Sequence, residues 1–120
     1  PTLTPQPPIT RTPVPASMCF TLENSTSGAG RTCQTAGFPF STIELYSASG
    51  STATIVIETR VDPAAPWVVF DTITDPPAVS SPPTMLVELP RVQAVRARIV
   101  SLTSGSIYAL IARYYQPQPN

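Results

Sequence analysis

Histidine and lysine are absent from the 120 residues of this chain, and only 12% of its residues are charged. The lack of histidine removes the commonest general base and the commonest metal ligand. Seven arginines balance seven acidic residues, so the formal net charge is zero and nothing in the composition favours nucleic acid or an anionic membrane surface. No apolar run reaches the roughly 20 residues that cross a bilayer. We therefore expect no nucleic-acid partner and no membrane partner.

The residues that act as nucleophiles in other proteins lack the groups that usually activate them. Serines are abundant, but the sequence offers no histidine or lysine to activate them, and neither cysteine has a base. A glycine-rich phosphate loop is also missing. Three aspartates, Asp62, Asp71 and Asp75, are candidates for a calcium site, but their spacing matches no calcium-binding loop. The sequence thus predicts no enzyme activity, no cofactor and no metal.

Proline is abundant, with 16 residues in total and six of them among the first fifteen. Prolines remove backbone donors and fix φ, so residues 1–16 are expected to form an extended arm, followed by one domain over residues 17–116 and a short tail over residues 117–120. A disordered tail and an arm that lies along a neighbouring molecule both fit this composition. In the second case the partner-binding residues of the arm are Leu3, Pro5, Pro7, Pro8, Ile9, Arg11, Pro13 and Val14.

Between the arm and the tail, short segments of alternating apolar and polar residues are separated by turn residues. A period of two is the pattern of half-buried strands. The apolar faces expected for these strands are Met18, Phe20 and Leu22, then Ile43 and Leu45, then Ile55 and Ile57, and finally Met85, Val87 and Leu89. The number and spacing of the segments predict an all-β fold, an antiparallel β-sandwich or jelly roll of about eight strands. The proline-rich stretch 74–83 is expected either to cross between sheets or to reach a partner.

The stretch over residues 92–115 predicts two long strands joined by a tight turn at Gly105. A two-residue turn would place Arg96, Arg98 and Arg113 on one face, whereas a three-residue turn would move Arg113 to the other face. We favour the first register, because the second turns Arg113 towards the core. In both registers apolar side chains remain beside Arg96 and Arg98 on the outer face. Such a face is usually covered, either by the same chain or by another. In the second case both arginines are candidate partner-binding residues.

Cys19 and Cys33 are the two cysteines of the chain. If the turn between their segments is centred on Thr26, they fall opposite each other in an antiparallel pair, at a Cα separation of about 4.5–5.5 Å that a disulfide tolerates. A disulfide formed outside the cell and two reduced thiols in a reducing cytosol both remain open.

Trp67 stands at the start of a segment rich in aromatic and β-branched residues, WVVFDTI. An aromatic ring of this kind can stack on a sugar. The other residues of the segment are typical of a core strand, so we favour a buried or edge-capping tryptophan.

Two runs, GSTATIVIETRVDPAAPWVVFDTIT and VQAVRARIVSLTSGSIYALIARY, resemble small β-sandwich proteins of tailed-phage virions. In the first run, a Thr/Val-rich strand ends in an acidic residue and is followed by an Asp-containing turn and a strand that begins with Trp. In the second run, a strand in which arginines alternate with apolar residues precedes a Ser-Gly turn and the last strand. The likeness spans residues 50–114 and leaves out the arm. The residues that carry it are Ile55, Ile57, Glu58, Asp62, Trp67, Val95, Arg96, Ala97, Arg98, Ser104 and Gly105.

This resemblance implies a non-enzymatic bacteriophage protein of the capsid decoration (cement) type, located in the virion after assembly in the host cytoplasm. The start at Pro1 fits removal of an initiator Met from a protein made in the cytosol. Its partners would be the major capsid protein or other virion subunits, bound through the arm and one sheet face. By analogy the protein would be a homo-oligomer, with a trimer as the expected form.

Two other functions fit the same sequence. The first is a carbohydrate-binding or host-adhesion β-sandwich, in which Trp67, Tyr46, Tyr108 or Tyr114 would present rings to a glycan. The second is a subunit of an extracellular filament, which would also use the arm and would polymerise as a pure protein.

Overall fold

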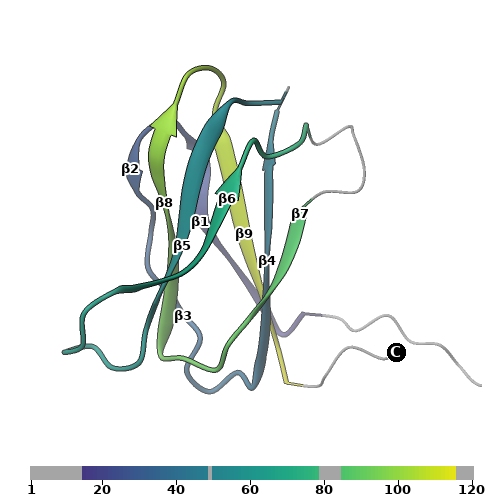
Figure 1. The fold of residues 1–120 in the computed structure, drawn as a ribbon. Helices are drawn as coiled ribbons and strands as arrows, with labels where there is room; N and C mark the ends of the chain where they lie inside the picture. The colour runs from purple at the N-terminus through teal and green to yellow at the C-terminus, as the bar shows by residue number, and fades with distance from the viewer. Residues whose placement is uncertain (1–14, 49, 79–84, 116–120) are drawn as a thin grey trace, which may run out of the picture.

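Two antiparallel β-sheets packed face to face make up the computed structural model, which describes residues 15–48, 50–78 and 85–115 (Figure 1). The described residues contain no helix, and therefore none that could cross a membrane. The all-β sandwich expected from the sequence is confirmed. The strands are β1 (Ser17–Ser25), β2 (Gly28–Ala29), β3 (Cys33–Gln34), β4 (Phe40–Ser47), β5 (Ala53–Arg60), β6 (Val68–Thr74), β7 (Met85–Leu89), β8 (Ala94–Leu102) and β9 (Ile107–Tyr114).

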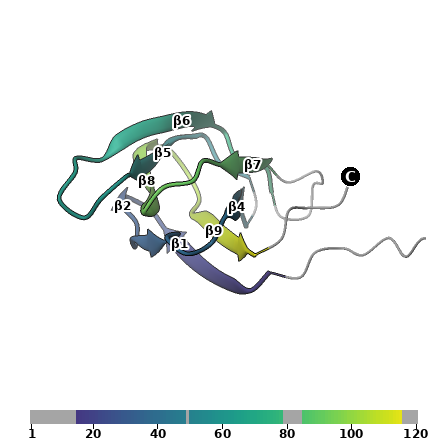
Figure 2. The same ribbon diagram turned by 90° about the horizontal axis from the view of Figure 1, so that it is seen from below.

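The strand order is that of a jelly roll (Figure 2). Sheet A has the order β1-β9-β4-β7, and sheet B has the order β2-β8-β5-β6, with β3 also paired to β8. Successive strands alternate between the sheets, apart from β2 and β3, which follow each other along β8, and the hairpin of β5 and β6. The proline-rich connection from β6 to β7 therefore crosses between the sheets, which is the first of the two expected outcomes.

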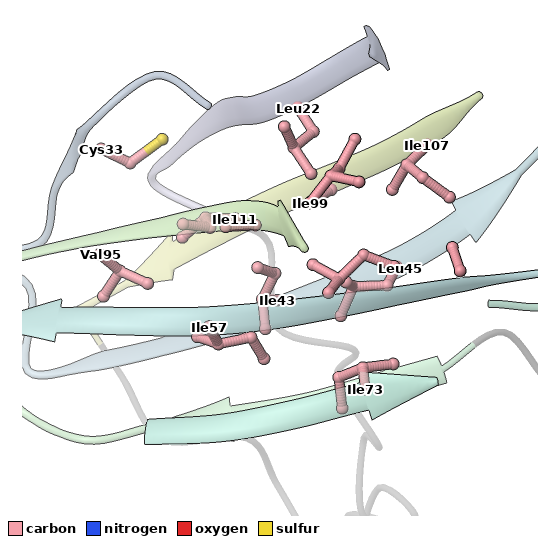
Figure 3. Packing of buried hydrophobic residues seen from close by; sticks show 14 residues of the cluster. Leu22, Cys33, Ile43, Leu45, Ile57, Ile73, Val95, Ile99, Ile107 and Ile111 are labelled. Atoms are coloured by element: carbon pink, nitrogen blue, oxygen red, sulfur yellow. The ribbon is translucent and has the colours of Figure 1, made fainter. Parts of the chain in front are cut away.

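The hydrophobic core lies between the sheets and consists mainly of branched aliphatic side chains (Figure 3). Full burial of each such side chain contributes about 1.5–3 kcal/mol. The inward faces predicted for β4, β5 and β7 are confirmed. Their core residues are Ile43 and Leu45, Ile55 and Ile57, and Met85, Val87 and Leu89.

The hairpin predicted over residues 92–115 is wrong, because β8 and β9 belong to different sheets. Both strands present small apolar side chains to the same core from opposite sides, and this alternation looks the same in the sequence whether the strands pair or face each other. Neither of the two predicted registers therefore exists. The core-facing residues are Val95, Ala97 and Ile99 in β8, and Ile107, Ala109 and Ile111 in β9.

Arg113 lies on the core-facing side of β9, the orientation that we disfavoured. It is accommodated there because it is near the end of the sandwich, where polar atoms of both sheets are in reach. Its Nη1 donates a hydrogen bond to the Gln34 carbonyl oxygen at 2.7 Å, and its Nη2 donates to Ser17 Oγ. Its guanidinium also lies 5.1 Å from the centre of the Phe38 ring.

Strand β1 departs from simple alternation at Thr21. Its register against β9 shifts between Phe20 and Leu22, so that Thr21 and Leu22 are both buried, whereas Met18 is exposed. The single face predicted for Met18, Phe20 and Leu22 is therefore wrong. The buried hydroxyl is satisfied, because Thr21 Oγ1 accepts a hydrogen bond from the Ala97 amide of the opposite sheet at 3.0 Å.

Cys19 and Cys33 form a disulfide, with their Cα atoms 6.0 Å apart. The predicted geometry, in which they lie opposite each other on paired strands, is wrong. Cys19 is opposite Ile111 in sheet A, and Cys33 is opposite Val95 in sheet B. The chain leaves sheet A after Ser25 and continues along β8, so the disulfide ties one sheet to the other.

Candidate interaction surfaces

Both strand arginines predicted to bind a partner lie on the outer face of sheet B. They alternate with the core residues of β8, and their strand pairs with β5. A group of charged and aromatic side chains gathers around them from β5 and from the loop before β6. We call this surface the arginine face. It consists of Glu58, Arg60, Trp67, Arg96 and Arg98.

Glu58 is the centre of the arginine face. It is only 7% exposed, and one of its oxygens, Oε1, accepts hydrogen bonds from Arg96 Nε at 3.0 Å and from Arg98 Nε at 3.3 Å. Hydrogen bonds from charged partners offset the cost of removing a carboxylate from water. The two bonds in turn restrict both arginine side chains, so their guanidinium groups are held in place before any partner arrives.

Trp67 belongs to this outer face and not to the core between the sheets. The guanidinium carbon of Arg60 lies 4.6 Å from the ring centre, and that of Arg96 lies 4.4 Å from it. Both distances are typical of cation–π contacts. Arg60 is further held by a hydrogen bond from its Nε to Gln93 Oε1 at 3.2 Å. Trp67 thus contacts two of the three arginines of this face.

The arginine face is suited to binding an anionic group. Three guanidinium groups face one carboxylate, which leaves an excess of positive charge. Within the described part of the chain, the side-chain hydrogen bonds of these arginines run from Nε, so their Nη1 and Nη2 donors remain for another acceptor. A planar fork of donors matches a carboxylate or a phosphate. The arrangement offers binding and positioning of such a group.

The outer face of sheet A has the opposite charge. The sequence assigned it no charge-based role, although Tyr46 and Tyr108 of this face were candidates in the glycan-binding alternative. We call it the acidic face. Its side chains come from β1, β4, β7 and β9 and alternate with the core residues of those strands. Its members are the carboxylates Glu23, Glu44 and Glu88 and the apolar or aromatic residues Met18, Phe20, Tyr46, Leu86, Tyr108 and Leu110.

Tyr46 and Tyr108 are directly opposite in β4 and β9, and their rings stack with centres 5.1 Å apart. Burial raises the pKa of Tyr46 above its ordinary value, and the nearby Glu44, Tyr108 and Glu23 raise it further. Glu44 and Glu23 thus lie near this phenol on the acidic face.

A third feature is a depression of about 510 Å³ at the end of the sandwich, beside the last residues of β9. Phe38 lies at its wall and stacks on Tyr115, with ring centres 5.2 Å apart. The lining residues are Thr35, Ala36, Gly37, Phe38, Pro39, Val61, Arg91, Val92 and Gln93.

The three aspartates considered for calcium do not come together. Asp75 Oδ1 accepts a hydrogen bond from the Ala53 amide at 3.1 Å, and Asp62 Oδ1 accepts one from the Ala64 amide at 2.9 Å. Among the described residues, no three side chains of the metal-binding types form a cluster. These carboxylates stabilise turns.

The predicted binding residues of the arm fall outside the described residues, so the structure does not place them relative to the arginine face. They are Leu3, Pro5, Pro7, Pro8, Ile9, Arg11, Pro13 and Val14.

Comparison with known proteins gives one similar structure. No family model matches the chain, and no curated protein matches it. The fold is similar to that of the crystal structure of SPBc2 prophage-derived protein YomS, with a TM-score of 0.60 and 15% sequence identity over 81% of this chain and 91% of that chain. At this identity the likeness shows a shared fold.

Proposed function

We propose that this protein is a non-enzymatic structural subunit of a bacteriophage virion, of the capsid decoration (cement) type. In this proposal it binds the major capsid protein or other virion subunits through the proline-rich arm and the arginine face. It acts in the virion, as a homo-oligomer, after assembly in the host cytoplasm.

The observation that carries the proposal is the pair of arginines fixed on Glu58. Side chains that are already ordered lose little conformational entropy when a partner docks. Arg96 and Arg98 stand on a sheet in a rigid two-layer fold, so they form a firm, flat and positively charged contact surface. Such a surface suits repeated binding to another protein surface that carries carboxylates.

The shared fold with a prophage-derived protein supports the phage assignment by analogy. Jelly rolls are also common in viral capsid subunits, and they occur in lectins. The glycan alternative loses support at Trp67, because two guanidinium groups already occupy its ring. Tyr46 and Tyr108 likewise stack on each other. We therefore place the structural role first.

Binding to capsid shells assembled without this protein tests the proposal. Purified full-length protein should sediment with the shells at a fixed ratio of copies. Removal of residues 1–14 should abolish this binding, and Arg98→Gln should weaken it about tenfold, whereas Arg31→Gln, a change at an exposed arginine outside the arginine face, should not. If the full-length protein, the truncated protein and the two arginine variants all bound equally, neither the arm nor the arginine face would contact the shell.

A further inference from the structure

We infer that copies of this chain associate head to tail, with the acidic face of one copy docked on the arginine face of the next. This inference goes beyond the proposed function, because it concerns the contact between two copies and does not require a phage origin.

The charges of the domain are separated onto opposite sides of the sandwich. The acidic face carries Glu23, Glu44 and Glu88, and none of the arginines in the described strands shares it. The arginine face carries three arginines against one glutamate. Because the whole chain has zero net charge, this separation gives the domain two complementary surfaces and no overall repulsion between copies.

Both faces also carry the apolar groups that a stable contact needs. On the acidic face Met18 is 61% exposed and Leu86 is 57% exposed. On the arginine face Trp67 is half-buried, and beside it Val69 is exposed on the edge strand β6. Interfaces of proteins are enriched in aromatic residues, Met and Arg at their centres. The contact would bury apolar area while matching each guanidinium fork with a carboxylate.

The orientation follows from the two-layer architecture, in which the outer faces of the sheets point in opposite directions (Figure 2). A symmetric dimer through either face would set like charges against each other, which costs free energy. A contact between unlike faces avoids this cost. It leaves an arginine face free at one end of the row, where the proposed virion partner can bind, and an acidic face free at the other end. Copies therefore add in a row and do not stop at two.

Sedimentation velocity of the full-length protein, over a range of concentrations, tests this inference. At about 0.05 M NaCl the sedimentation coefficient should rise with concentration. At about 1 M NaCl, where charges are screened beyond about 3 Å, association should weaken at least tenfold. A protein that remains monomeric at low salt and high concentration would overturn the inference.

Two variants, each altered on one face, identify the surfaces. Leu86→Arg with Glu88→Gln adds one positive charge to the acidic face and removes one negative charge, a net change of +2. Thr72→Glu with Thr74→Glu adds two negative charges to the arginine side of sheet B. All four positions are paired within their sheets and all four are exposed, so the fold should persist. Each variant alone should lose self-association at least tenfold.

The decisive step is to mix the two variants. Each retains one intact face, and these intact faces are complementary, so an equimolar mixture should form 1:1 pairs and no larger species. Matched charge changes away from both faces, Thr26→Arg with Ser104→Arg and Thr26→Glu with Ser104→Glu, should associate like the unaltered protein. A variant that still self-associates, or a mixture that forms no pairs, would contradict the head-to-tail contact. Because no capsid is present, these outcomes are independent of the capsid-binding test.

Discussion

Arg96 Nε lies 3.0 Å from Glu58 Oε1, across the pair of strands β8 and β5. The same oxygen accepts a second hydrogen bond from Arg98. The carboxylate is almost fully removed from water, whereas both arginines remain partly exposed. The ion pairs therefore have two roles. They stabilise a buried charge, and they hold the guanidinium groups of Arg96 and Arg98 in place on the outer face of sheet B.

Glu58→Gln tests the first role. The substitution leaves two guanidinium groups without their carboxylate, and we expect the free energy of unfolding to fall by about 1–3 kcal/mol, towards the lower figure because the arginines are partly solvated. Urea denaturation measures this difference. Glu88→Gln, at an exposed position of β7, should change stability by less than about 0.5 kcal/mol. Equal effects of the two substitutions would show that the cluster contributes nothing to stability.

The disulfide between Cys19 and Cys33 closes a loop with a sequence separation of 14 residues. A loop of this length corresponds to about 3 kcal/mol of stabilisation through the unfolded state. Reduction should therefore lower the urea midpoint of unfolding. The double variant Cys19→Ala with Cys33→Ala should have the midpoint of the reduced protein, and adding reductant should not change it. An unchanged midpoint after complete reduction would contradict this expectation.

Gly30 is required by a close backbone approach. A Cβ atom at this position would lie 1.9 Å from the Thr21 carbonyl oxygen, which also accepts a hydrogen bond from the Arg31 amide at 2.7 Å. Gly30→Ala must displace backbone, and we expect a loss of about 3 kcal/mol or more. Gly28→Ala meets no atom within 4 Å and strains only its own φ of 78°, so its cost should be about 1 kcal/mol. Thermal unfolding of both variants measures these two losses. If Gly28→Ala lost more stability than Gly30→Ala, Thr21 would move freely and the expectation would be wrong.

The raised pKa of Tyr46 predicts that the protein loses stability at alkaline pH. Its pKa is raised in the folded protein by burial and by the negative charge of Glu44, so the native state favours the neutral phenol. This contribution is fully present below the unfolded pKa of about 10 and is lost as pH rises through the folded pKa.

Unfolding measured between about pH 9 and pH 11 should show this decline, and Tyr46→Phe should reduce it. Glu44→Gln should lower the pKa of Tyr46 towards its ordinary value, as followed by phenolate absorbance. Glu88→Gln removes a carboxylate that is not among the causes of the shift and serves as the control. An equal shift in both glutamine variants would assign the raised pKa to the general charge of the face.

The sequence predicted the fold class because alternation alone marks which side of a strand faces the core. Ile43 and Ile57 were placed correctly by that rule. Alternation does not say which strand lies alongside, so β8 and β9 were wrongly paired with each other. It also fails where an extra residue shifts the register, as Thr21 does in β1.

Arg96 and Arg98 were found as outward residues for the same reason. The burial of Glu58 was not predicted, because it depends on the pairing of β5 with β8. The position of Trp67 against Arg60 and Arg96 depends on the path of the loop before β6. The acidic face was missed as a charged surface, although Tyr46 and Tyr108 were named as candidates for glycan binding. Gathering Glu23, Glu44 and Glu88 on one face requires the order of four strands.

Quantitative mass spectrometry of purified virions tests the proposed function most directly. If the protein is a structural subunit, it should remain with the particles through density-gradient purification, in many copies and at a constant ratio to the major capsid protein. Detection of the protein in infected cells but not in purified particles would contradict the proposal.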